Sequence, residues 1–141
     1  MQRQKVFMFV MALALALALA SPALAQQQAC PAPLKPMLRA ELYFGRDIHG
    51  EQIVSDQEWA RFLAHELTPR FPHGLTVVDG WGEWRDGGTG ALVREPSKIV
   101  VIVTAEADDL RARIDAVVDA YRKQFKQESI GIVLEPVCAV F

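Results

Sequence analysis

The residues best suited to chemistry are aromatic, arginine and acidic side chains spread along the chain, not a compact motif. Glu95 precedes a proline at a predicted strand interruption, and such breaks often re-aim side chains beside sites. The alternative for Arg94-Glu95 is a surface ion pair of little energetic weight. Six residues are candidates to line one ligand pocket: Tyr43, Arg46, Arg70, Trp81, Trp84 and Glu95.

Metal and nucleophile chemistry find little support in the residue spacing. A zinc site needs three or four ligands with some local pairing, which the histidines lack. On a strand, the adjacent Ser97 and Lys98 would point to opposite faces, which argues against a serine–lysine nucleophile. Gly80-Trp81-Gly82 has no following Lys-Ser/Thr, so it is not a phosphate loop. We therefore expect no metal and no cofactor. The histidines concerned are His49, His65 and His73.

The first 25 residues predict a secretory signal peptide. Arg3 and Lys5 precede the unbroken apolar run Val6–Ala20, and Ala23-Leu24-Ala25 supplies a small-x-small cleavage site. The apolar run is shorter than the roughly 20 residues that span a bilayer, although an uncleaved anchor helix is the alternative. We expect cleavage after Ala25, a periplasmic or secreted product, and no membrane span in the mature chain.

Both cysteines lie beyond the predicted cleavage site, near the two ends of the mature chain. An exported protein meets an oxidising compartment, where a pair of cysteines favours a disulfide between Cys30 and Cys138. The alternatives are two free thiols or a lipid-modified Cys30.

Residue periodicity predicts six elements in the order strand, helix, strand, strand, helix, strand. Apolar and polar residues alternate over 38–44, and Ser55 to Glu58 has the capping-box spacing that begins a helix. The five β-branched residues Ile99–Val103 predict a central strand that is covered on both faces. An apolar stripe at helical spacing occupies 110–125, and alternation resumes over 130–134.

This element order is the split βαβ pattern of the ferredoxin-like α+β fold. It predicts a four-stranded antiparallel sheet in the order 4-1-3-2, with two helices on one face. Pro136 then lies in an edge strand, where proline is tolerated. The chain divides into a signal peptide (1–25), a proline-rich lead-in (26–36) and a single α+β domain (37–141).

Glycine and tryptophan alternate between the second strand, Leu75–Val78, and the hairpin turn Asp86–Gly90. A plain edge strand does not require the segment Gly80–Trp84, so we expect a bulge or bend there. Such a bend would let the two indoles cap the core or cover the open face of the sheet.

Several blocks of the chain resemble a small family of exported bacterial proteins, the domain of unknown function 3574. The blocks keep the family order, although His73 and Glu83 depart from the expected residues. The resemblance implies no activity, because the family has none assigned. The blocks are ELYFGR (41–46), VSDQEWARFL (54–63), TPRFPHGLTVVDGWGEWR (68–85), REPSKIVVIV (94–103) and YRKQFKQESI (121–130).

The open sheet face is the best functional lead. The chain has 17 acidic and 15 basic residues and no basic stripe, so we do not expect nucleic acid as a partner. The face would carry Arg39, Glu41 and Tyr43 beside alternate residues of Ile99–Val103, and exposed apolar patches usually mark interfaces. The first hypothesis is a non-enzymatic exported domain that forms a homodimer, or binds a small molecule or cell-envelope partner, through this face. The alternative, by fold analogy alone, is a small dimeric α/β-barrel-type enzyme, either a cofactor-free oxidoreductase or an isomerase.

Overall fold

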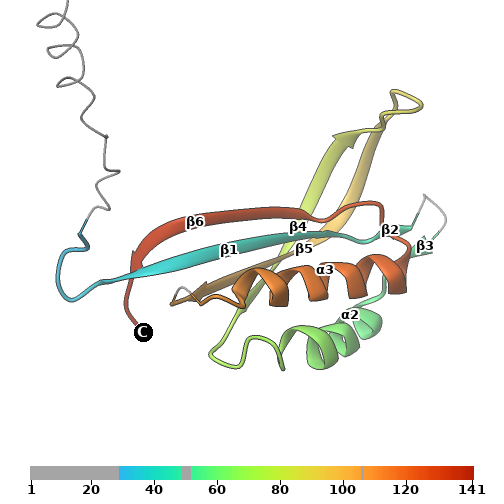
Figure 1. Ribbon diagram of the computed structural model, residues 1–141. Coiled ribbons are helices and arrows are strands. Elements are labelled where there is room, and N and C mark those ends of the chain that lie inside the picture. The colour runs from blue at the N-terminus through green and yellow to red at the C-terminus, as the bar shows by residue number, and fades with distance from the viewer. Residues whose placement is uncertain (1–28, 49–51, 106) are drawn as a thin grey trace, which may run out of the picture.

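The computed structural model describes residues 29–48, 52–105 and 107–141. The predicted signal peptide and its cleavage site lie outside these residues, as do the start of the lead-in and His49. The described chain forms one four-stranded sheet with helices on a single face, and a separate two-stranded hairpin (Figure 1).

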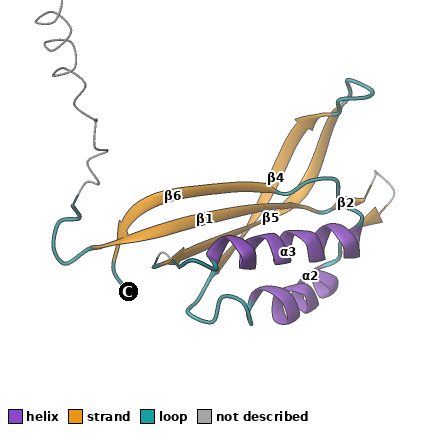
Figure 2. Cartoon of the chain, in the orientation of Figure 1, coloured by secondary structure: helices purple, strands orange, loops and turns teal. Residues whose placement is uncertain are grey.

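The elements follow one another in the predicted β-α-β-β-α-β order, with a short extra hairpin after the first strand (Figure 2). The elements are β1 (Lys35–Gly45), β2 (Asp47–Ile48), β3 (Gln52–Ile53), α2 (Asp56–Phe62), the π-helix η1 (Leu63–Leu67), β4 (Thr76–Arg85), β5 (Leu92–Thr104), α3 (Leu110–Phe125) and β6 (Gly131–Ala139).

The four long strands form an antiparallel sheet in the spatial order β4-β5-β1-β6. The long strands β1, β4, β5 and β6 are the first to fourth in the chain. Read from β6, their spatial order is therefore 4-1-3-2. The short strands β2 and β3 pair only with each other. Their two-residue length explains why no sequence periodicity marks them.

The helix-covered face holds the hydrophobic core. Alternate β1 side chains, from Ala40, Leu42 and Phe44, are buried beneath the helices, as a period of two requires. Five aromatic rings then meet there, with neighbouring ring centroids 4.7–6.1 Å apart. They come from β1, α2 and α3: Phe44, Trp59, Phe62, Tyr121 and Phe125.

The predicted capping box begins α2. The amide of Glu58 donates to Ser55 Oγ at 3.2 Å, and the Ser55 amide donates to Glu58 Oε2 at 2.8 Å. The hydrogen bond from the Ser55 side chain lowers the pKa of Glu58. The helix then widens into η1, where the Thr68 amide donates to the Leu63 carbonyl at 2.9 Å, and it ends before Pro69.

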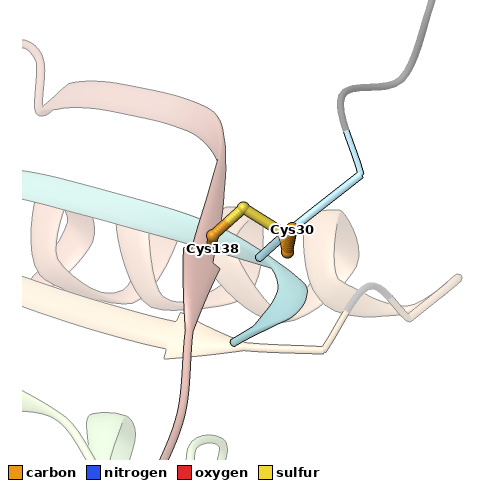
Figure 3. The surroundings of a disulfide bond; sticks show 2 residues. All are labelled: Cys30 and Cys138. Carbon is orange, nitrogen blue, oxygen red and sulfur yellow. A yellow bond between two sulfur atoms is a disulfide. The ribbon is translucent and has the colours of Figure 1, made fainter. Parts of the chain in front are cut away.

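The two cysteines form the predicted disulfide, which ties the lead-in to the last strand (Figure 3). Cys138 lies in β6 opposite Pro36 of β1, and the Cα atoms of Cys30 and Cys138 are 5.5 Å apart. Neither described cysteine is free, so the bridge replaces the thiol and lipid alternatives.

The expected bulge at Gly80–Trp84 is wrong, and so is the expected interruption of β5 at Pro96. Strand β4 pairs residue for residue with β5 from Thr76 to Arg85, and β5 continues through the proline. Gly80 has a different explanation: a Cβ there would lie 2.7 Å from Ser97 Oγ on the neighbouring strand.

The β4–β5 hairpin extends beyond the rest of the sheet. Strand β1 stops pairing with β5 at Gly45 and Ser97, so residues 81–96 form a two-stranded ribbon, here called the hairpin arm. The arm leaves the plane of the sheet (Figure 1). The bend therefore belongs to the whole arm and not to a local bulge.

Candidate functional site

A pocket of about 680 Å³ lies on the open sheet face, at the base of the hairpin arm. Its walls come from the arm, the end of β1 and the loop between α3 and β6. Both aromatic and polar side chains line it, which is the usual composition of a small-molecule site. The lining residues used below are Tyr43, Asp47, Trp84, Glu95, Ser97 and Gln127.

Glu95 links the hairpin arm to the body of the domain. Its Oε1 accepts a hydrogen bond from the Trp84 indole N–H at 3.0 Å, and its Oε2 accepts one from the Asp47 backbone N–H at 2.9 Å. The carboxylate lies directly over Gly45, where an added Cβ would be 2.7–2.9 Å from its atoms. Glycine at position 45 therefore lets Glu95 fold across the end of β1 and fix the indole as a pocket wall.

Tyr43 forms a second aromatic wall. Its ring stands against Gly131 of β6, and its side chain is on the open face because the preceding and following β1 residues are buried in the core. The hydroxyl donates to the Glu41 carboxylate, and this hydrogen bond raises the pKa of Tyr43. Tyr43 is therefore protonated at neutral pH, with its one proton donated to Glu41, and its ring suits a stacking surface.

The backbone beneath Glu95 is held from the core side. The Tyr121 hydroxyl donates to the Gly45 carbonyl at 2.9 Å, and Gln127 Nε2 donates to the Asp47 carbonyl at 2.5 Å. Burial raises the pKa of Tyr121 far above its ordinary value. Two side chains from α3 and its following loop thus position the pocket floor.

Acidic side chains outnumber basic ones around the pocket. Four carboxylates, from Asp47, Asp86, Glu95 and Glu128, line it with a single Lys126. Asp86 is committed to its own turn, because Thr89 donates to its carboxylate and lowers its pKa. The electrostatic character of the pocket favours positive charge and hydrogen-bond donors.

Three of the six sequence-predicted site residues meet at the pocket, namely Tyr43, Trp84 and Glu95. Arg46 is buried on the helix side, where its Nε donates to the Val54 carbonyl at 2.6 Å and its guanidinium pairs with Asp56 at 3.0 Å.

Arg70 and Trp81 lie away from the pocket. Arg70 follows η1 and pairs with Glu66 at 2.8 Å. Trp81 lies opposite Pro96, with 68% of its surface exposed. On a regular strand, residues 81 and 84 are separated by an odd number of positions and so face opposite sides of the sheet.

Sequence reasoning missed several lining residues. Ser97 lies two positions from Glu95 on a strand, so the alternation signal was sufficient to place both on one face. Asp47 and the loop 126–129 approach the pocket only through tertiary folding, and no local pattern marks them. Over the described ranges, no group of three or more His, Cys, Asp or Glu residues is arranged to hold a metal ion. Within those same ranges, no helix has both the length and the apolarity needed to cross a membrane.

Comparison with known proteins gives a family and a fold. The family described as "Protein of unknown function (DUF3574)" matches residues 39–141. No curated protein sequence matches the chain. Similar solved structures are a phage SAM lyase in complex with S-methyl-5'-thioadenosine (TM-score 0.59, 16% identity, 74% of this chain and 90% of that one) and the phage SAM lyase in its apo state (0.54, 19%, 70% and 79%). CutA from Synechococcus elongatus is also similar, with a TM-score of 0.50 and 14% identity over 77% of this chain and 86% of that one.

Proposed function

The chain belongs to the DUF3574 family of proteins of unknown function, and we propose that it is an exported domain that binds a small organic molecule on its open sheet face. The observation that carries this proposal is the pocket at the base of the hairpin arm, in which Glu95 fixes the Trp84 indole beside Tyr43.

The lining indicates the chemistry of the ligand. A flat ring would stack against the Trp84 indole, which remains 43% exposed although its N–H is already bonded. A cationic or hydrogen-bond-donating group would meet Glu95, because each carboxylate oxygen can accept more than the one protein donor it has here. The excess of carboxylates over Lys126 disfavours an anionic ligand.

One similar structure was solved with a bound small molecule. The phage SAM lyase was solved with S-methyl-5'-thioadenosine, a molecule that also combines a flat ring with polar groups. At 16% identity that likeness carries the fold alone, so the ligand class proposed here rests on the pocket of this chain.

Binding without turnover is part of this proposal. No arginine is among the pocket-lining residues of the described chain, and Arg46 and Arg70 are engaged elsewhere. The hydrogen bond to Glu41 raises the pKa of Tyr43, so its hydroxyl stays protonated at neutral pH and does not serve as a general base there.

Export is the second part of the proposal. It is supported by the positive, apolar and small-residue segments at the start of the chain and by the disulfide between Cys30 and Cys138. Intact-mass measurement of the protein from its own cells should give a chain that starts at Gln26 and lacks two hydrogens. A chain that retains residues 1–25 would contradict the export proposal.

Calorimetric titration with ring compounds matched in size tests the binding function. A cationic ring should bind more tightly than its neutral analogue, and an anionic analogue should bind least. Glu95→Gln should weaken the cationic compound about tenfold or more while leaving the neutral one less affected. Trp81→Phe is the matched control for Trp84→Phe, because its indole lies outside the pocket. Equal losses of affinity in Trp81→Phe and Trp84→Phe would contradict the proposal. So would the absence of binding by all three compounds.

A further inference from the structure

The two edges of the sheet differ in their ability to pair with another strand. On one edge, β6 carries Pro136, which has no N–H to donate, and Cys138 joins it to the lead-in. On the other edge, β4 has no proline or lysine over its ten residues, and no described segment pairs with its outer side. The outer side of such an edge strand presents unpaired N–H and C=O groups to a second strand.

The sequence of β4 is complementary to itself about Gly82. If two antiparallel copies of β4 are centred there, the acidic Asp79 lies opposite the basic Arg85 of the second copy. Gly80 lies opposite Trp84, and Trp81 lies opposite Glu83. Opposite charges across a strand pair are stabilising, and an aromatic ring can cover the gap left by an edge glycine.

Neighbouring registers lack this complementarity. In an antiparallel pair of strands, directly opposite residues must face the same side of the sheet. Two copies of β4 related by a two-fold axis must therefore have that axis at a residue. The neighbouring registers have the axis one residue further along the strand. A centre at Trp81 would place Asp79 opposite Glu83, and a centre at Glu83 would place two glutamates face to face. A centre at Gly80 pairs no opposite charges. A centre at Trp84 would place Glu83 opposite Arg85, but β4 ends at Arg85, so only three of its residues would pair. Among the registers that pair at least five residues of β4, only the one about Gly82 matches charge with opposite charge.

The side chains concerned are accessible for such pairing. Asp79 bonds Lys98 within its own chain, yet its side chain remains 82% exposed. Trp81 is 68% exposed and Trp84, although its N–H is bonded to Glu95, is 43% exposed, so both rings keep surface that a second copy can contact. Gly82 has no side-chain atom nearby, since an added Cβ would find only the Glu95 carbonyl at 3.9 Å.

We infer that two copies of this chain associate through antiparallel pairing of their β4 strands about a two-fold axis at Gly82, which joins two four-stranded sheets into one. The pairing uses the same edge on both copies, and the β6 edge is obstructed, so the assembly closes as a dimer and does not propagate. Trp81 and Gly82 of β4 thereby acquire a role that the folded monomer does not explain. The dimer does not depend on a ligand in the pocket.

Cysteine cross-linking tests both the partner and the register. In the inferred dimer, the two residues at position 82 face each other with Cα atoms about 4.5–5.5 Å apart, within disulfide range. Under mild oxidation, Gly82→Cys should form a covalent dimer on a non-reducing gel. Glu83→Cys is the matched control, because offset positions place its copies more than about 7 Å apart. A covalent dimer that forms equally well with Glu83→Cys, or not at all with Gly82→Cys, would overturn the inference.

Charge exchange supplies a test without cysteines. Sedimentation velocity should show a concentration-dependent dimer for the unmodified chain. Arg85→Asp should raise the dissociation constant about tenfold or more, because two aspartates would then face each other. The double variant Asp79→Arg/Arg85→Asp should recover association, and Arg111→Asp on α3 should leave it unchanged. Circular dichroism verifies that each variant is folded. A folded unmodified chain that remains monomeric throughout the micromolar range would overturn the inference.

Discussion

The two faces of the sheet use aromatic side chains in different ways. On the helix-covered face, five rings contact one another and exclude water, with Tyr121 and Phe62 almost fully buried. On the open face, Tyr43 and Trp84 remain partly exposed and are held in place by hydrogen bonds to carboxylates. The buried rings of the helix-covered face stabilise the fold. The rings of the open face are held in place by hydrogen bonds while part of their surface stays exposed. Positioning without coverage is what a binding surface needs.

The largest expected effect is on the covered face. Phe62→Ala removes a ring that contacts four others and leaves a cavity, so it should lower the free energy of unfolding by about 3–5 kcal/mol. Tyr43→Ala, on the open face, should cost far less in chemical denaturation. Equal losses from the two variants would contradict the division between the faces.

The disulfide should give the next largest effect. Cys30 and Cys138 are 108 residues apart, so the bridge restricts a long loop of the unfolded chain. Reduction should lower the free energy of unfolding by about 2–4 kcal/mol. Denaturation curves with and without reductant measure the difference, and overlapping curves would show that the bridge contributes nothing.

Tyr121 connects the two faces, because its ring lies in the core and its hydroxyl holds the pocket floor at Gly45. At neutral pH, Tyr121→Phe should cost about 1 kcal/mol through loss of that hydrogen bond. The raised pKa of Tyr121 adds a pH dependence. The unfolded tyrosine ionises near pH 10 while the folded one keeps its proton, so stability falls as pH rises above about 10.

The Phe variant has no hydroxyl to ionise, so its stability should decline less steeply in this alkaline range. Denaturation at a series of alkaline pH values compares the two slopes. Identical slopes would show that Tyr121 is not shielded from ionisation in the folded state.

Substitution of the exposed tryptophans should have the smallest effect on stability. Trp81→Phe and Trp84→Phe should each change the free energy of unfolding by about 0.5 kcal/mol or less. They should differ in ligand binding, since only Trp84 lines the pocket. A large loss of stability from Trp84→Phe would instead give the Glu95–Trp84 hydrogen bond a structural role.

The sequence supported the fold better than the site. Alternation over β1, the capping box at Ser55 and the β-branched run in β5 are local signals, and each gave the right element. The glycines of Gly80–Trp84 predict a bulge or bend, because sequence alone does not reveal that Ser97 fills the space where a side chain at position 80 would be.

The candidate site was predictable only in part. Strand alternation placed Tyr43 on the open face, and the proline after Glu95 drew attention to that carboxylate. The contact of Glu95 with Asp47, across 48 positions of the chain, depends on where β1 stops pairing with β5. Arg46 shows the opposite error: an arginine beside the pocket residues in sequence turned out to be buried beneath the other face.

The central claim is that the open face, and not the covered one, receives a ligand. The three tryptophans can report where a ligand binds, because each lies in a different place. Trp59 is in the core, Trp81 is on the helix side of the arm and Trp84 is in the pocket. Their indole N–H signals can be followed in one nitrogen–proton NMR spectrum during titration with a cationic ring compound. We predict that the Trp84 signal moves in a saturable manner while the signals of Trp59 and Trp81 stay in place. A saturable shift of Trp81 or Trp59 without one of Trp84 would contradict the account.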